Sequence, residues 1–193
     1  MLELIKEEID VANQEYNDLD LKDKIIANKN LDNIIFNKCN FSNVQFINVV
    51  LSNVTFNSCN LSNASVINSG LHNITYKESM LIGFNISEST LKHNNFDEIQ
   101  GKYLSLSKCK VLDTKFNKCN LNNANLFDLK FKNVIFKEND MTKISINMTS
   151  FRDIDLTSNE INGLSIGIND LKGVIIDITQ AAQIVGILDV KIK

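Results

Sequence analysis

The residues best suited to chemistry in this sequence are its four cysteines. Cys39, Cys59 and Cys119 stand at multiples of twenty residues from one another, and Cys109 stands ten before Cys119. Zinc sites combine Cys and His ligands at short, fixed spacings, and no histidine accompanies these thiols. Cys39 and Cys59 would be close enough for a disulfide if residues twenty apart are neighbours. We expect reduced, buried thiols instead, because disulfides are rare in the cytoplasm.

The sequence contains no recognisable set of catalytic residues either. A nucleophilic Ser or Cys needs a base within hydrogen-bond reach, and His72 and His93 both fall outside any such motif. The seven glycines form no phosphate-binding loop. We therefore predict that the protein is not an enzyme and that it uses no cofactor and no metal.

Length and composition limit the possible classes of protein. The chain has 193 residues, 44% of them hydrophobic, no proline and a net charge of -3, which suits a single globular domain. No apolar run approaches the roughly 20 residues that span a bilayer, and the acidic start MLELIKEEID is unlike a signal peptide. We expect a cytoplasmic protein without a membrane association. Asparagine accounts for 29 residues, which favours turns or stacked side-chain ladders over long helices.

Hydrophobic residues recur at every fifth position along most of the chain. From Leu21 to Ile176, 31 of the 32 positions in this series are apolar or aromatic, and only Gly101 breaks it. The residue two before each of them is also small or apolar in most repeats. A period of five fits neither the helix period of 3.6 nor the strand period of 2. It predicts a chain that turns a corner every five residues.

A second period of twenty residues is superimposed on the first. FNKCNF from Phe36, FNSCNL from Phe56 and FNKCNL from Phe116 are near-copies in one register. Four sides of five residues would close one coil, so residues twenty apart should stack at roughly 4.8 Å. The predicted core stack has one aromatic residue in each of six coils: Phe36, Phe56, Tyr76, Phe96, Phe116 and Phe136.

These repeats predict an all-β parallel β-helix of about eight coils over residues 21–176, roughly 40 Å long at the strand spacing. Gly101 predicts a local packing gap or bend, with a flexible joint as the alternative. Asn139 and Asn159 stand twenty apart at inward positions and predict an amide ladder in the core. Residues 1–20 should form an N-terminal cap. Their spacing fits an amphipathic helix, but we favour an extended cap ending in an early coil, since Val11 and Tyr16 continue the five-residue register.

Units such as CNFSN at 39–43, CNLSN at 59–63 and CNLNN at 119–123 resemble the pentapeptide-repeat family. The resemblance covers residues 21–176. It implies a right-handed quadrilateral parallel β-helix.

The C-terminal segment 177–193 resembles a narrower group. In the Qnr-type fluoroquinolone-resistance proteins, the last coil is followed by a helix with a Gln-Ala pair and then a short strand, and these elements form a head-to-head homodimer. Here DLKGVIID is followed by Gln180 and Ala181, and LDVKI starts at Leu188. We expect a helix over 179–188, with Thr179 as its N-cap, and a short strand after it. The expected dimer contacts are Ala181, Ala182, Ile184, Val185, Ile187 and Leu188.

The same resemblance implies DNA mimicry, in which an acidic rod occupies the DNA-binding surface of DNA gyrase or topoisomerase IV and protects it from fluoroquinolones. Residues 153–189 contain six acidic side chains against Lys172 alone, a net charge of -6 + 1 = -5. The expected contacts are Asp153, Asp155, Glu160 and Asp170. The alternative is a non-catalytic interaction or structural scaffold with another partner.

A basic stretch between residues 97 and 137 weakens the mimic hypothesis, because its eight lysines outnumber four acidic residues. Clustered lysines can bind phosphates directly. These eight fall on different sides of the predicted coil, however, so we expect a solvated surface and no direct nucleic-acid binding. They are Lys102, Lys108, Lys110, Lys115, Lys118, Lys130, Lys132 and Lys137.

Overall fold

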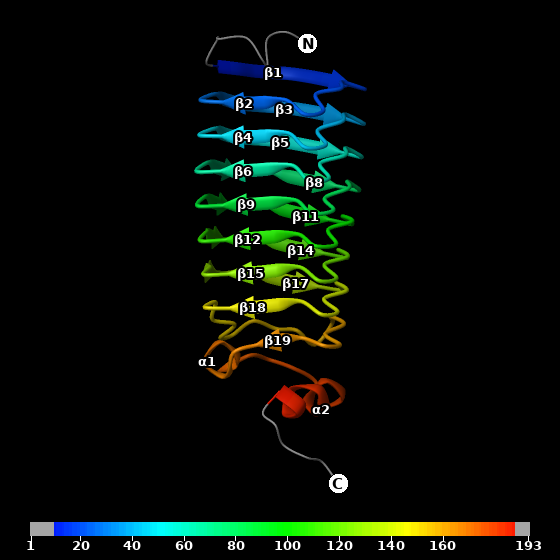
Figure 1. Cartoon of the computed structure of the whole chain (residues 1–193), viewed down its shortest axis with the longest axis vertical. Coiled ribbons are helices and arrows are strands. Elements are labelled where there is room, and N and C mark those ends of the chain that lie inside the picture. The colour runs from blue at the N-terminus through cyan, green and yellow to red at the C-terminus, as the bar shows by residue number, and fades with distance from the viewer. Residues whose placement is uncertain (1–9, 188–193) are drawn as a thin grey trace.

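The computed structural model describes residues 10–187 and shows a rod of stacked coils, with two short helices at its C-terminal end (Figure 1). The structure consists mainly of parallel strands (46% strand, 7% helix), which form a β-solenoid of about 8 turns. The predicted all-β solenoid with a C-terminal helix is therefore confirmed. Neither helix in the described part is long and apolar enough to cross a membrane.

Each coil has four sides of five residues, numbered here in chain order. Side one, starting with the segment 19–23, is held by isolated bridges between successive coils, from Asp20 and Asn40 to Asp140 and Glu160. Side two is an eight-stranded parallel sheet. Its strands are β2 (Ile25–Ala27), β4 (Gln45–Ile47), β6 (Ser65–Ile67), β9 (Asn85–Ser87), β12 (Ser105–Ser107), β15 (Asn125–Phe127), β18 (Ser145–Asn147) and β19 (Ser165–Ile166).

Sides three and four belong to one eleven-stranded sheet. Three long strands span both sides: β1 (Asp10–Asn17), β3 (Asn30–Asn37) and β5 (Val50–Asn57). Later coils have one short strand on each side. Side three has β7 (Gly70–His72), β10 (Thr90–Lys92), β13 (Lys110–Leu112) and β16 (Lys130–Lys132). Side four has β8 (Thr75–Lys77), β11 (Asn95–Asp97), β14 (Lys115–Asn117) and β17 (Ile135–Lys137).

The N-terminal register begins before Leu21. Strand β1 pairs with β3, which places Val11 beside Leu31 and Tyr16 beside Phe36. The described part of the predicted cap is therefore extended rather than helical. Residues 1–9 of that cap lie outside the described residues.

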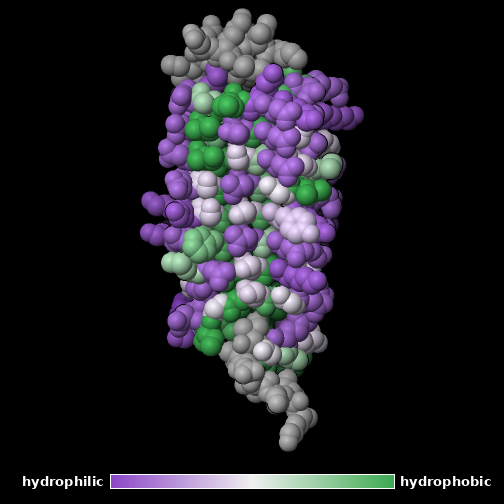
Figure 2. Space-filling view, viewed as in Figure 1, coloured by the Kyte–Doolittle hydropathy of each residue, from purple (hydrophilic) through white to green (hydrophobic). Residues whose placement is uncertain are grey.

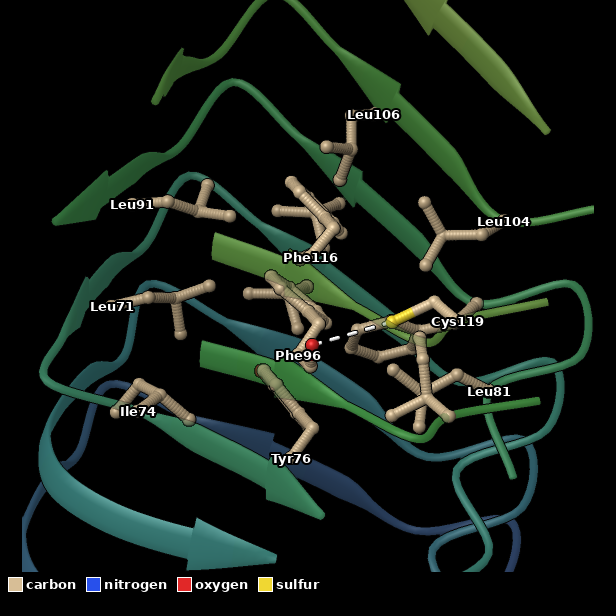
Figure 3. Packing of buried hydrophobic residues seen from close by; sticks show 14 of the residues in the cluster. Leu71, Ile74, Tyr76, Leu81, Leu91, Phe96, Leu104, Leu106, Phe116 and Cys119 are labelled. Carbon is tan, nitrogen blue, oxygen red and sulfur yellow. Dashed lines mark hydrogen bonds between the residues drawn. The ribbon is translucent and has the colours of Figure 1, made fainter. Parts of the chain in front are cut away.

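The interior is a column of stacked side chains. The six aromatic residues from Phe36 to Phe136 are all buried, and their successive ring centroids lie 5.3, 5.2, 4.7, 4.6 and 4.9 Å apart in near-parallel planes. Figure 3 shows Tyr76, Phe96 and Phe116 in this column. Stacked rings add to the free energy of burial. The outer surface in Figure 2 is mainly hydrophilic with small apolar patches.

Gly101 leaves no packing gap. A Cβ atom at this buried position would lie 3.0 Å from Ile99 Cδ1 and 3.3 Å from Leu121 Cδ2. Ile99 stands where neighbouring coils have the smaller Ser79 and Cys119, so its side chain occupies the space that Gly101 vacates. The predicted gap is wrong because a larger residue at position 99 compensates for the smaller residue at the neighbouring inward position 101.

The corners explain the abundance of asparagine. Twenty-eight non-glycine residues, nearly all five apart, have φ between 48° and 62°, a left-handed conformation that Asn adopts more readily than most residues. Asn side chains also join successive coils, as in the 2.7 Å bond from Asn33 Nδ2 to Asn13 Oδ1. The inward pair behaves as predicted, because Asn139 Nδ2 donates to Asn159 Oδ1 at 2.9 Å.

Met148 is a corner residue with φ 52° and a 66% exposed side chain. We expect Met148→Asn to raise the free energy of unfolding by about 1 kcal/mol, because Asn lowers the cost of the left-handed conformation. Met148→Val should lower it by a similar amount, since a β-branched residue disfavours this backbone. Thermal unfolding followed by circular dichroism would test both; a Val variant at least as stable as the Asn variant would contradict the corner argument.

The coil changes character toward the C-terminus. The ladders of sides three and four end at β16 and β17, whereas side two continues through β18 to β19. A four-residue helix, α1 (Ile168–Leu171), occupies the last coil, and α2 (Ile178–Ile187) follows it. The uninterrupted register in the sequence thus does not give uninterrupted backbone pairing.

Candidate functional site

The four cysteines are buried and free. Cys39, Cys59 and Cys119 lie in one inward column, where the Cys119 thiol donates to the carbonyl oxygen of Phe96 at 3.3 Å (Figure 3). Burial raises the pKa of the Cys119 thiol to about 12. A protonated, buried thiol is a poor nucleophile. Burial also raises the pKa of the Cys109 thiol, so Cys109 and Cys119 act as small core residues. A hydrogen bond between the Cys39 and Cys59 thiols lowers the pKa of Cys39 to about 7 and raises that of Cys59.

The two histidines lie on side three. His72 ends β7, and His93 occupies a corner where its Nδ1 atom is 3.8 Å from Asp113 Oδ2. No group of three or more His, Cys, Asp or Glu residues that could hold a metal ion occurs between residues 10 and 187.

The C-terminal end of the core is closed by polar side chains. Asn159 Nδ2 donates to Phe136 O at 3.0 Å. Below it, the buried Gln180 side chain donates to the carbonyl oxygens of Leu156 and Asn159 at 2.9 and 2.8 Å. The end of a solenoid leaves backbone groups without a following coil, so Gln180 replaces part of the missing strand.

Helix α2 is capped by Asp177, and the predicted Thr179 cap is wrong. Asp177 Oδ1 accepts from the backbone amides of Thr179 and Gln180 at 2.7 and 2.9 Å and from the Thr179 hydroxyl at 2.7 Å. The Thr179 hydroxyl first, and then the Gln180 amide, hold the pKa of Asp177 below its ordinary value. The carboxylate also favours the positive end of the helix.

The residues predicted for a dimer interface do not all face outward. Ile184 is 7% exposed and packs in the core, whereas Ala182 is exposed, and Ala181 and Val185 are half-buried. The side chain of Ile187, the residue Leu188 and the predicted strand after it lie outside the described part. The described apolar surface of α2 is smaller than its sequence suggests, because one face covers the last coil.

The four acidic residues predicted as partner contacts lie on three sides. Asp155 is exposed on side four and Glu160 on side one, while Asp153 and Asp170 lie on side three. The Thr157 hydroxyl and backbone amide donate to Asp155 Oδ1 at 2.7 and 2.8 Å, and they hold the pKa of this carboxyl below its ordinary value. Its carboxylate is therefore ionised and fixed in direction.

Four acidic residues on the neighbouring sides one and four combine predicted and missed positions. Asp140 bridges to Glu160 on side one, and Asp155 and Asp177 lie on the adjacent side four. Within residues 10–187, none of these four carboxylates lies within 4.0 Å of a cationic group. We call Asp140, Asp155, Glu160 and Asp177 the acidic surface. Counting charge along the chain from Asp153 missed Asp140, although its position twenty residues before Glu160 would have revealed it.

The eight lysines of the basic stretch are spread over the coil. Three of them, Lys110, Lys130 and Lys132, share side three with Arg152. Lys115, Lys118 and Lys137 lie on side four, Lys102 lies on side one and Lys108 is at the corner after side two. This distribution gives no continuous track for a nucleic-acid backbone.

Comparison with known proteins adds the following. Residues 49–126 match a family model described as a pentapeptide repeat region. No curated protein matches the chain. Among solved structures, a trypsin-treated variant of QnrB1, a plasmid-mediated fluoroquinolone resistance protein, is 17% identical over 96% of this chain and 99% of that chain, with a TM-score of 0.38. HetL, involved in heterocyst differentiation regulation in the cyanobacterium Nostoc, is 16% identical over 87% and 89%, with a TM-score of 0.31.

Proposed function

We propose that this chain, whose residues 49–126 match a pentapeptide repeat region, acts without catalysis, as a DNA mimic that binds a type II topoisomerase, DNA gyrase or topoisomerase IV. Protection of that enzyme against fluoroquinolones would follow from occupation of its DNA-binding surface. The acidic surface is the observation that carries the proposal. We place this activity in the cytoplasm, where the partner acts.

Fixed negative charge on a rigid frame supports this function. The carboxylates of Asp155 and Asp177 are oriented by hydrogen bonds that also keep them ionised. Asp140 and Glu160 sit one coil apart, in a ladder that holds them at the strand spacing. Complementary potential of this kind steers association with a basic protein surface.

A homodimer through the C-terminus is part of the proposal. It would place two copies of the acidic surface near one two-fold axis and double the local negative charge. Asp177 caps the helix that carries the exposed Ala182, so the acidic surface and the proposed interface are adjacent. Sedimentation should then give twice the chain mass of 21.8 kDa.

Side two favours a second candidate, a protein-interaction scaffold. None of the residues in its eight strands is charged, and Ser and Asn dominate their outward positions. Loss of charged residues is typical of the centre of protein–protein interfaces. Mimicry of DNA phosphates does not require an uncharged side.

A supercoiling assay separates the two candidates. Purified gyrase should be inhibited by this protein at micromolar concentration and should be less sensitive to a fluoroquinolone in its presence. Asp155→Asn with Glu160→Gln should weaken the effect at least about tenfold. Both substitutions keep side-chain shape and hydrogen-bond acceptors, so melting temperature should not change.

Asp153→Asn with Asp170→Asn is the matched control, because those carboxylates share side three with cations. This control pair should weaken the inhibition of gyrase less than the first pair does. Inhibition by the unaltered protein should also fall steeply as the salt concentration rises. If the unaltered protein has no effect on gyrase or topoisomerase IV, the mimic proposal fails and the scaffold function remains.

A further inference from the structure

A cavity opens where the ladders of sides three and four stop. It has a volume of about 580 Å³ and lies between the segment from Leu129 to Val134 and the segment from Ser150 to Ile154. On side two the neighbouring strands β18 and β19 remain paired. The rod is thus open on one flank and closed on the other.

Two large aromatic residues account for the opening. The inward column of side three has Leu or Val in the coils from Leu31 to Val111 and then Phe131 and Phe151 in succession. Phe151 is fully buried and packs 5.7 Å from Phe136 between ring centroids, whereas Phe131 is only half-buried and lies 5.5 Å from Phe151. Extra volume in a well-packed core displaces backbone. The wall therefore separates at this level.

Side-chain hydrogen bonds fix the opening at both ends. The Leu129 amide donates to Thr149 Oγ1 at 3.0 Å, and the Glu138 amide donates to Ser158 Oγ at 3.2 Å. These bonds join the two coils on either side of the cavity. The opening is consequently bounded and built into the sequence.

Unpaired cations line this cavity. Lys130, Lys132 and Arg152 contribute to its wall, and Lys110 pairs in register with Lys130. Among the described residues none of the four lies within 4.0 Å of a carboxylate. By contrast, other lysines of the basic stretch are paired, such as Lys118 with Glu98 at 3.7 Å. Like charges directly opposite in a ladder are unfavourable, so an anion bound here would relieve their repulsion.

We propose that the cavity binds an organic anion of about mononucleotide size. Its phosphate or carboxylate would be held by Lys130, Lys132 and Arg152, and its ring or apolar part would pack on the half-buried Phe131. The volume falls within the ~300–1,000 Å³ typical of ligand sites. An arginine fork suits a planar or tetrahedral anion, and Asp153, the one carboxylate in the cavity wall, can accept from a ligand hydroxyl or amino group.

Isothermal titration calorimetry with adenosine monophosphate, benzoate, inorganic phosphate and adenosine tests the proposal. We expect saturable binding of an anion that has a ring, and at least about tenfold weaker binding of adenosine. Lys132→Gln with Arg152→Gln should abolish it. Lys118→Gln, on side four, should leave it unchanged. Three results would overturn the proposal. The two variants could have equal effects, adenosine could bind as tightly as adenosine monophosphate, or none of the anions could bind at millimolar concentration.

A second variant tests the cause of the opening independently of charge. Phe131→Leu removes the half-buried member of the two aromatic residues. The wall should then close, amide exchange of residues 130–133 should slow and ligand binding should be lost. Its melting temperature should equal or exceed that of the unaltered protein. Unchanged binding in a folded Phe131→Leu variant would contradict the assigned site. A single-stranded oligonucleotide could bind more tightly than the mononucleotide and bind equally well to the Phe131→Leu variant. That result would indicate phosphate contacts on the surface and would also overturn the proposal.

Discussion

Replacing Phe116 by aspartate is expected to prevent stable folding. Phe116 is 1% exposed and stacks between Phe96 and Phe136 with centroid distances of 4.6 and 4.9 Å. A carboxylate there would have no cation to pair with, and burial of an unpaired charge costs several kcal/mol. That cost is comparable with the roughly 5–15 kcal/mol stability of a typical domain. Circular dichroism and thermal melting would measure the loss.

Two milder variants at the same level serve as controls. Phe116→Leu keeps an apolar side chain and should cost about 1–3 kcal/mol while the protein stays folded. Lys118→Ala, on the outer surface, should change stability by less than about 0.5 kcal/mol. Wild-type melting of the Phe116→Asp protein would show that this column is not the core.

Replacing Gln180 by methionine should release the C-terminal cap. Gln180 is 5% exposed and donates to two backbone carbonyl oxygens, of Leu156 and Asn159. Methionine fills similar volume but removes the donor to Asn159 O, at about 1–3 kcal/mol. It also removes one of the two donors to Leu156 O, which still accepts from the Asn159 amide at 2.9 Å. Amide hydrogen exchange in α2 should accelerate strongly. If α2 forms the proposed dimer, light scattering should also show a shift toward the monomer.

Gln183→Met provides the comparison one turn along the helix. Gln183 is half-buried, and its Nε2 donates to Asn162 Oδ1 at 2.7 Å in a bond that is open to solvent, so water can replace the lost partner. Exchange rates in α2 should therefore change little. Equal acceleration in the two variants would contradict the role assigned to Gln180.

The solenoid could be predicted because each inward position repeats a simple requirement for size and hydrophobicity. The series from Leu21 onward carries that requirement in the sequence itself, and the stack through Phe116 follows from it. The interruption could not be predicted in this way. Phe131 and Phe151 satisfy an apolar pattern as well as leucine does, so the pattern gives no sign of the cavity beside them.

The candidate surfaces were harder to predict because contacts across coils do not follow the order of the chain. A charge count along residues 153–189 groups Asp153 with Asp155, yet the two lie on different sides. The same count omits Asp140, which the ladder places beside Glu160. The prediction of the helix cap was wrong for a local reason. Asp177 and Thr179 are both good N-caps, and which of them caps the helix depends on the residue at which the last coil ends.

Ile99 and Gly101 are energetically coupled, because the side chain of Ile99 lies where a side chain at position 101 would go. A larger residue at 101 would meet Ile99 Cδ1 and the backbone oxygen of Asn120, at 3.0 and 3.2 Å from the new Cβ. A smaller residue at 99 alone would empty the space that its side chain fills. Each single substitution is unfavourable, although both together restore the pattern of the neighbouring coils. The stability changes of the two single substitutions should therefore not add, and the double variant should be more stable than their sum predicts.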